Sequence, residues 1–552
     1  MAATHEVLNQ VPPLVGHDTA QDPALLEGLE REGAGWAIPE VRELGRLAGS
    51  EEAQEWGRLA ERVPPRLQTH DRYGHRIDEV EYVPAYHELM KVAVGHGLHA
   101  APWADDRPGA HVARAAKFLV WSVDAGHGCP ISMTYAVVPA LRANPGLSAR
   151  FEPLLTNREY DPGLRDPATK RGLIAGMSMT EKQGGSDVRA NTTTATPQRS
   201  AESDGAGADG EYELVGHKWF TSAPMSDMFL TLAQAPGGLS CFLVPRVLPG
   251  GEHNAMSLVR LKDKLGNRSN ASSEVEYDGA RGWLVGEEGR GVRTIVEMVN
   301  MTRLDCVIGT AAGMRTGLVQ AAHHARHRRA FGKPLIEQPL MRNVLADLAV
   351  ESEAATTAMV RLAGANDRAI RGDEGEAALR RIALAVTKYY VCKRGPMHAA
   401  EALECLGGNG YIEDSGMPRI YRELPLLSIW EGSGNVAALD ALRALGREPH
   451  TLDAFFGEVE QAAGVDLRYD EALATLKKEL TTFDDLELRA RRIVEQMALV
   501  FQGAQLMRYA PSAVADAFVA SRLDRDWGGA LGTLPPGLDL GPIIERGLVD
   551  VP

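Results

Sequence analysis

A glutamate at the end of an apolar run is the strongest candidate for chemistry in this chain. Glu431 follows the segment Leu424–Trp430, and three small residues come directly after it: Gly432, Ser433 and Gly434. A carboxylate beside tryptophan and aliphatic side chains is expected to be poorly solvated, which raises its pKa and its strength as a base. The small residues would let the backbone approach a flat ligand closely.

The same stretch has a simpler interpretation. Ser433 or Asn435 is placed to cap a helix that begins near Val436. Taken alone, the pattern is more typical of a loop with an exposed glutamate before an ordinary helix. The choice between the two depends on the motifs in the rest of the chain.

Two other stretches combine hydrogen-bonding groups with glycine or a flat side chain. In Met177–Asp187, the hydroxyls of Thr180 and Ser186 flank two glycines, and such a loop suits a heterocycle or a phosphate. Further on, Trp219 offers a flat face, and Thr221 is predicted to point to the same side of a strand. The alternatives are a polar loop that closes a domain and a tryptophan in the core.

Three patterns along the chain predict the elements that position these residues. Up to about residue 170 the apolar spacing predicts mainly helices, at Pro23–Glu32, Val41–Leu59, Val83–Gly95 and Val112–Leu141. The next segment predicts strands at Glu211–Val215, Met228–Ala233, Leu239–Val244 and Glu274–Tyr277, with a mobile loop at Ser200–Gly210. Long amphipathic patterns then predict a helical bundle from Val292–Arg329, Val344–Arg371 and Glu374–Leu406.

The segment after residue 446 predicts an added helical domain. Regular apolar positions recur at Leu452–Ala463, Asp470–Leu480, Leu486–Tyr509 and Ala513–Leu523, before a Pro- and Gly-rich stretch at 528–542. The fold class is therefore mainly α with an inserted β domain. We expect domains at residues 1–171, 172–288, 289–446 and 447–552.

The composition excludes several classes of protein. The 552 residues are 44% hydrophobic and 24% charged, which suits a globular protein with a large core. A net charge of −15 argues against a general attraction to nucleic acid or anionic membrane. Five scattered cysteines without a CxxC pair suit reduced thiols. Without a signal-peptide pattern or an apolar run of membrane-spanning length, we expect a soluble, cytoplasmic protein with no membrane partner.

Several separated motifs resemble those of the acyl-CoA dehydrogenases. The stretches around Thr180 and Trp219 are similar to the family's flavin-binding β domain. Arg328–Pro334 is like the family's Arg-x-x-Phe-Gly-x-Pro, and Gly407–Tyr411 is like its Gly-Gly-Asn-Gly-Tyr. Trp430–Ser433 stands where the family has an aromatic residue, Glu, Gly and Thr. Their common order, over about 170–445, makes the resemblance specific.

More narrowly, the chain resembles the AidB-type branch, flavoproteins of the adaptive response to DNA alkylation. The supporting residues are Asn9–Asp18, Thr180–Ser186, Leu265–Asn270 and the extra C-terminal domain. With these ends included, the resemblance covers nearly the whole chain. It implies a helical N-terminal domain, a β-barrel-like middle domain, a four-helix-bundle domain and the extra helical domain.

The resemblance also implies a bound FAD. The residues it assigns to the cofactor are Met177, Met179, Thr180, Gly185, Ser186, Trp219, Phe220, Thr221, Arg328, Phe331, Gly407, Gly408, Asn409, Ile429, Trp430, Gly432, Ser433 and Asn435. Arg328 and Phe331 would reach the nucleotide half of FAD. Gly407–Asn409 would do so from a neighbouring subunit, so a homo-oligomer is implied, which we expect to be a tetramer.

Glu431 would be the catalytic base of this family's reaction. It would take the α-proton of an acyl-CoA-like thioester while a hydride from the β-carbon goes to flavin N5. Some family members take the base from the helix ahead of the conserved arginine. Here Thr302 precedes Arg303, which leaves Glu431 as the candidate.

Three positions depart from the family's pattern. Gln338 is shifted by one from the family's glutamine, which puts one FAD contact in doubt. Glu404 replaces a glutamine near the cofactor's phosphates, where a carboxylate would be less welcome. Lys182 replaces a proline, so the loop that follows Thr180 can differ in shape.

Three weaker patterns are discounted. Gly286–Gly291 is similar to a dinucleotide glycine loop but lacks the strand–helix–strand unit, so we predict a turn into the long helix. Neither His323 with His327, at metal-ligand spacing, nor the group His70, Asp71 and His75 has the further ligands of a strong metal motif, so no metal site is expected.

The AidB-type resemblance further implies that residues 447–552 bind double-stranded DNA. This segment holds 11 Lys and Arg against 18 Asp and Glu, whereas a basic domain is the usual footprint of DNA binding. The candidate contacts are Arg489, Arg491, Arg492, Arg522 and Arg525. The alternative is a solvated helix face with intrahelical ion pairs.

The sequence thus leaves three functions open. The first is an AidB-type FAD protein that binds DNA and protects it from alkylation, with weak, isovaleryl-CoA-like dehydrogenase activity. The second is a metabolic short- or branched-chain acyl-CoA dehydrogenase without a DNA role. The third is a non-catalytic FAD-binding protein.

Overall fold

The computed structural model describes residues 4–198, 210–482 and 484–551, and it divides the chain into two compact units. One unit comprises Met1–Gln54, Pro108–Ser122 and Arg303–Pro552, and the other comprises Glu55–Arg107 and Val123–Thr302. The N-terminal helical segment therefore contributes to both units. Of the mobile loop predicted at Ser200–Gly210, residues 200–209 lie outside the described residues.

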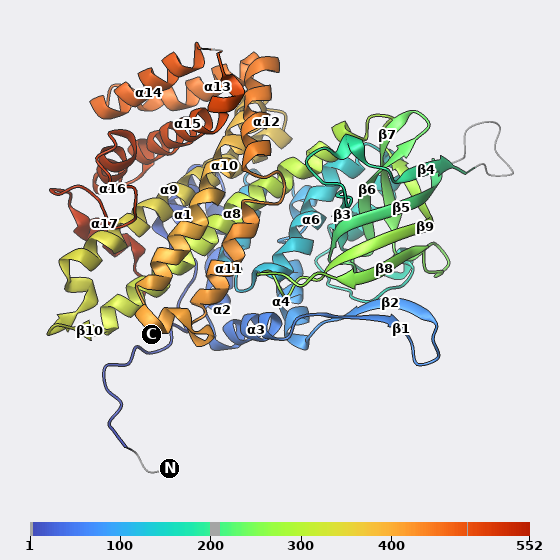
Figure 1. The fold of residues 1–552 in the computed structure, drawn as a ribbon, viewed down its shortest axis with the longest axis horizontal. Helices are drawn as coiled ribbons and strands as arrows, with labels where there is room; N and C mark the ends of the chain where they lie inside the picture. Colours follow the sequence, from blue (N-terminus) through green and yellow to red (C-terminus); the bar gives the residue numbers. More distant parts are fainter. Residues whose placement is uncertain (1–3, 199–209, 483, 552) are drawn as a thin grey trace. The chain divides into compact units, whose positions relative to one another are not determined.

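The inserted β domain is a seven-stranded, barrel-like sheet (Figure 1). Its strands run in the order β3-β6-β4-β5-β9-β7, β7 also pairs with β6, and β8 pairs with β9. The strands are β3 (Ala175–Ser178), β4 (Thr194–Pro197), β5 (Glu211–Ser222), β6 (Met228–Ala235), β7 (Gly238–Pro245), β8 (Met256–Leu261) and β9 (Ser272–Val285). Buried side chains such as Leu214, Phe229, Phe242 and Val275 fill the interior. The four predicted strands are confirmed within β5, β6, β7 and β9.

The same unit contains a hairpin that was not predicted, between the helices predicted at Val41–Leu59 and Val83–Gly95. Strands β1 (Arg66–His70) and β2 (Arg76–Glu81) pair antiparallel. The Asp71 carboxylate accepts backbone hydrogen bonds from Tyr73 (2.8 Å) and His75 (2.9 Å) and so fixes the turn. Charged side chains in both strands interrupt the alternation of apolar and polar residues from which a strand is predicted. Helices α4 (Pro84–Gly95), α6 (Ala125–Leu141) and α7 (Pro145–Leu155) complete the unit.

Two predicted helices are each divided in two. Val41–Leu59 is α2 (Ile38–Ala48) followed by α3 (Glu51–Arg62), and Val112–Leu141 is α5 (Ala110–Val120) followed by α6. The first break is at Gly49, where a Cβ atom would lie 1.8 Å from the His17 carbonyl oxygen. The second precedes Asp124, whose side chain caps α6.

Long helices build the other unit. They are α8 (Gly291–His327), whose part from Arg303 belongs here, α9 (Pro339–Ile370) and α10 (Glu374–Glu404). The shorter helices α1 (Pro23–Arg31), capped by the Asp22 side chain, and α5 pack on α9, while α11 (Met417–Leu427) and α12 (Gly434–Arg447) pack on α10. The predicted long helices are confirmed, with ends displaced by a few residues.

The C-terminal helices pack directly on this bundle (Figure 1). They are α13 (Pro449–Val459), α14 (Leu467–Leu480), α15 (Leu486–Tyr509), α16 (Ser512–Phe518) and α17 (Leu540–Gly547). Leu506, Phe518 and Ile543 share one apolar cluster with Leu348 of α9. The added helical segment is therefore continuous with the bundle core.

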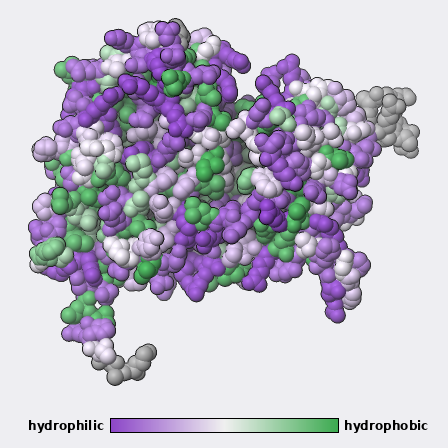
Figure 2. All heavy atoms as spheres, in the orientation of Figure 1, coloured by the Kyte–Doolittle hydropathy of each residue, from purple (hydrophilic) through white to green (hydrophobic). Residues whose placement is uncertain are grey.

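Across the described residues, no helix has the length and apolar character needed to cross a membrane. The face in Figure 2 is mainly hydrophilic, with apolar residues scattered between polar ones.

Candidate active site

Glu431 lies in a tight connection between α11, which ends at Leu427, and α12, which begins at Gly434. Its φ of 55° is in the left-handed region, which side chains other than glycine rarely adopt. Helix α12 starts earlier than predicted, and within the described chain Ser433 at its N-cap makes no side-chain capping bond. Ser433 thus occupies the N-cap position, as one of the two predicted alternatives, but without the expected side-chain bond. The Asn435 Oδ1 atom accepts a hydrogen bond from Arg491 Nε instead, at 2.8 Å.

Two cations hold the backbone around Glu431. Lys388 of α10 is only 1% exposed, and its Nζ donates to the Trp430 carbonyl at 2.9 Å and to the Gly432 carbonyl. Arg303 Nε donates to the carbonyl of Glu431 itself, at 2.9 Å. Three successive carbonyls thus have charged donors. A left-handed non-glycine residue costs about 1–3 kcal/mol and persists only where its surroundings determine it, and these contacts do so.

The two side chains before Glu431 are suited to contact a ligand. The indole Nε1 of Trp430 is buried without a hydrogen-bond partner among the described residues, and Ile429 is 62% exposed. Burial raises the pKa of the Cys306 thiol, and the nearby charge of Glu431 adds to this rise. Glu431 itself is half-buried.

The β domain brings its two predicted motifs together. The backbone N–H of Trp219 donates to the Thr180 carbonyl at 2.7 Å, and the Thr221 and Ser178 hydroxyls hydrogen bond to each other. A bulge in β5 lies between Lys218 and Thr221. Because both of these are buried while Trp219 is half-buried, the prediction that Trp219 and Thr221 share a strand face is wrong.

The aromatic and glycine residues that were predicted to contact the cofactor in this domain are accessible to solvent within their own unit. Phe220 is exposed, and Lys262 Nζ lies 3.0 Å from the ring centroid of Trp219. Gly184 has a φ of 134° and, among the described atoms, none within 4 Å of its Cβ position. Gly185 and Ser186 are exposed beside it. The Gly184 N–H donates to the Glu181 carbonyl at 3.0 Å, while the exposed backbone at Gly185 and Ser186 is accessible to a ligand.

A buried ion pair that the sequence did not reveal supports this loop. Glu181 and Lys218 are both buried, with Oε1 and Nζ 2.8 Å apart. Glu181 also accepts from the backbone N–H groups of Thr192 (2.7 Å) and Thr193 (3.1 Å). Burial opposes ionisation, but Lys218 and these donors outweigh it and lower the pKa of Glu181. No local pattern pairs residues 37 positions apart, so sequence reasoning had no signal for it.

The remaining cofactor candidates lie on the surface of the helical unit. Arg328 Nη1 donates to the Asn9 carbonyl at 2.5 Å, and Phe331 is 98% exposed. Gly407, Gly408 and Asn409 are exposed, and no described atom lies within 4 Å of the Cβ positions of the two glycines. This openness suits contact with a second molecule.

The five arginines predicted to contact DNA have different environments. Arg522 is 4% exposed and pairs with Asp347 and, at 2.9 Å, with Glu351, so its predicted DNA contact is wrong. Arg489 is held by Glu479 and by carbonyls near the end of α14. Arg491, Arg492 and Arg525 are exposed.

Comparison with known proteins places the chain in a family. Residues 176–280 match the acyl-CoA dehydrogenase middle domain, and residues 289–446 match the acyl-CoA dehydrogenase C-terminal domain. The Caenorhabditis elegans ACDH-11 structure in complex with C11-CoA has a TM-score of 0.84 and 28% identity, over 95% of this chain and 93% of that one. The apo-form of Bd2924 has a TM-score of 0.83 and 30% identity, over 92% and 100%.

The chain therefore belongs to the acyl-CoA dehydrogenase family, and it is an FAD-dependent, acyl-CoA-dehydrogenase-like oxidoreductase. Within the family it is of the AidB type. Residues 9–162 match the N-terminal domain of the adaptive response protein AidB. The chain is also 47% identical to the putative acyl-CoA dehydrogenase AidB of Escherichia coli K12, over 94% of its own length and 95% of that protein. The fold predicted from the resemblance is confirmed.

The residues present fit FAD. The indole N–H of Trp430 is a buried donor without a partner among the described residues, and no described atom crowds the Cβ positions of Gly184, Gly407 and Gly408, so a ligand can approach the backbone there. Heterocycle carbonyls and phosphates are acceptors for such groups. Bound FAD would supply the hydride acceptor.

Replacing Lys388 by methionine should lower the rate of flavin reduction by an acyl-CoA at least tenfold while FAD stays bound. The Trp430 and Gly432 carbonyls would lose their charged donor, and the backbone of Glu431 would no longer be fixed. Single-turnover rates and the flavin content of the purified protein measure this. Lys393→Met is the matched control, because Lys393 is on the same helix. Among the described residues, Lys393 makes no hydrogen bond to the connection that holds Glu431. Equal rates in both variants would contradict a positioning role.

Proposed function

We propose that the protein oxidises an acyl-CoA thioester, with Glu431 as the base that removes the α-proton. The observation that carries this proposal is the Glu431 connection, where Lys388 and Arg303 hold three successive carbonyls. Strained backbone that its surroundings fix in this way clusters at active sites, where it positions a side chain. The C11-CoA bound in the C. elegans structure supports an acyl-CoA as the ligand.

The chain's own groups would act in a definite order. Ile429 and Trp430 would cover the thioester and exclude water, which keeps the Glu431 carboxylate strongly basic. Glu431 would then accept the α-proton as the β-hydride leaves toward the cofactor. Lys388 and Arg303 would hold the backbone that carries this carboxylate throughout. We propose a short or branched acyl group, of the isovaleryl type, and Glu431→Gln tests the reaction as argued in the Discussion.

We further propose a homotetramer. The exposed Gly407, Gly408 and Asn409 would face the FAD of a neighbouring subunit, together with Arg328 and Phe331. Phe331, at 98% exposure, is an apolar residue that association would cover.

A second proposed function is binding of double-stranded DNA, with protection of that DNA from alkylation. The match to the adaptive response protein AidB supports it. Arg522 and Arg489 are excluded as DNA contacts by their ion pairs. The remaining candidates are Arg491 and Arg492 on α15, with Arg525. The segment is acidic overall, so we expect a small number of phosphate contacts and little sequence preference.

Replacing both Arg491 and Arg492 by glutamine should reduce the slope of log K against log salt for a duplex by about two. Each lost phosphate contact removes about one released counterion. Fluorescence anisotropy with one duplex between low and physiological salt measures the slope. Exposed Arg290 and Arg293, replaced together, provide the control. If the slope stays at the wild-type value, these two residues do not bind DNA.

A further inference from the structure

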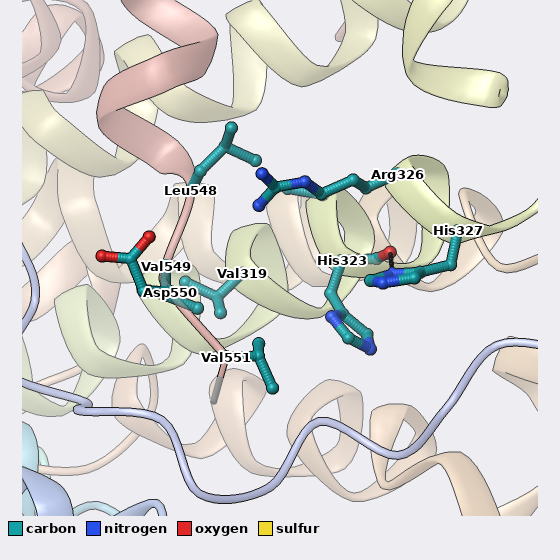
Figure 3. Close-up of a pocket in the computed structure, with 9 residues that line it drawn as sticks. Val319, His323, Arg326, His327, Leu548, Val549, Asp550 and Val551 are labelled. Carbon is teal, nitrogen blue, oxygen red and sulfur yellow. Dashed lines mark hydrogen bonds between the residues drawn. The ribbon is translucent and has the colours of Figure 1, made fainter.

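A pocket of about 330 Å³ lies beside the last turns of α8 (Figure 3). One wall is a single face of this helix, formed by Val319, Ala322, His323, Arg326 and His327, and the facing wall is the chain segment 548–551. A volume of this size is at the lower end of the range for small-molecule sites. The pocket lies within the helical unit, and none of its residues belongs to the site around Glu431.

One part of the pocket is apolar and fixed. Val319 and Val549 pack with Leu14 in a small buried cluster. Asp550 supplies the only carboxylate of the lining residues, but Gln21 engages it. The Asp550 backbone N–H donates to Gln21 Oε1 at 2.9 Å, and its Oδ2 accepts from Gln21 Nε2 at 3.0 Å. In Figure 3 this carboxylate points away from the histidines.

The other part of the pocket is rich in nitrogen. His323 Nε2 donates to the Pro12 carbonyl at 2.8 Å, and His327 Nδ1 donates to the His323 carbonyl at 2.9 Å. Carbonyl oxygens only accept, so these bonds fix which ring nitrogen carries the proton. The second ring nitrogen of each histidine has no hydrogen-bond partner in the described part of the chain. The centroids of the His323 and His327 rings are 4.4 Å apart.

The positive charge of this part is not compensated. Arg326 is exposed, and within residues 4–198, 210–482 and 484–551 it has no ion pair. Burial lowers the pKa of His323, and the charges of His327 and Arg326 lower it further. His323 is therefore neutral at neutral pH in the empty pocket, and an anion beside it and Arg326 would favour its protonation.

We propose that this pocket binds a small organic anion, namely a monocarboxylate with a short apolar body. A guanidinium matches a carboxylate with two parallel hydrogen bonds, and Arg326 is available for this pairing. The histidine nitrogens supply further donors when protonated. The valine side chains would cover the apolar body, since they form the part of the pocket without polar groups.

The test uses calorimetric titration of the full-length, FAD-containing protein with hexanoate. We expect saturable binding, at least tenfold tighter than that of hexan-1-ol, which has the same apolar body without the charge. Arg326→Gln should weaken hexanoate binding at least tenfold. Arg329→Gln, at an exposed arginine outside the pocket, should leave it unchanged.

A second variant tests the apolar part. Val551 is 38% exposed, so Val551→Trp should be tolerated by the fold and should fill the pocket. We expect it to weaken hexanoate binding as much as Arg326→Gln does. Wild-type affinity in either variant would overturn the proposal, because hexanoate would then be bound elsewhere. Inorganic phosphate that binds as tightly as hexanoate would overturn the apolar part of it.

Discussion

Replacing Glu431 by glutamine should slow reduction of bound FAD by an acyl-CoA by about 10²–10⁴-fold, the usual contribution of a positioned base. Glutamine has nearly the same shape, and the contacts of Lys388 and Arg303 are to the backbone, so the connection should keep its conformation. The expected loss is therefore one of proton transfer alone. Anaerobic bleaching of the flavin absorbance, followed with a panel of acyl-CoAs that includes isovaleryl-CoA, measures the rate.

Two comparisons make this result specific. Glu471→Gln, at an exposed carboxylate on α14, should reduce flavin at the wild-type rate. The FAD content of Glu431→Gln should equal that of the wild type, since a lost cofactor would mimic a lost base. Equal bleaching by both glutamine variants would show that another group is the base. A wild-type protein that no acyl-CoA bleaches would instead be a non-catalytic flavoprotein.

The long helices were predictable because their apolar periodicity extends over many turns. Helix α15 spans Leu486–Tyr509, as predicted, and α10 differs only at its C-terminal end. Short elements lack this redundancy, so β3, β4 and β8 and the β1–β2 hairpin were not predicted. A bulge leaves no trace in residue types, which is why the alternation through Trp219 and Thr221 misled.

Only those residues of the site that stand in short sequence motifs could be predicted. Glu431, Thr180 and Trp219 stand in recognisable stretches, but the residues that support them do not. Lys388 reaches the Trp430 carbonyl from 42 positions away, and Glu181, in the loop after β3, pairs with Lys218 of β5. Arg522 was predicted to be a surface cation because charge alone does not reveal a buried partner. Its partners lie 175 and 171 positions earlier in the chain.

Replacing Arg522 by methionine should destabilise the packing of the C-terminal helices by about 3–5 kcal/mol, the usual cost of leaving buried charges without their partner. Arg522 pairs with Asp347 and Glu351 of α9, and Arg394 also pairs with Glu351. Burial would raise the pKa of Glu351, but Arg394 and Arg522 outweigh it and hold the pKa at about 2. Urea unfolding followed by circular dichroism, with limited proteolysis of the C-terminal helices, measures the loss.

Arg525→Met is the matched control, since Arg525 is exposed on the same segment and should change stability by less than about 0.5 kcal/mol. The pH dependence supplies a second test. Because the pKa of Glu351 is lower in the folded protein than its ordinary value of 4.5, its ionised form stabilises the fold above pH 4.5. That contribution is lost as the pH falls from 4.5 toward 2. The loss should be smaller in Arg522→Met, whose Glu351 keeps only Arg394. If both variants unfold like the wild type, Arg522 does not anchor these helices, and its assignment to a DNA-binding surface would have to be reconsidered.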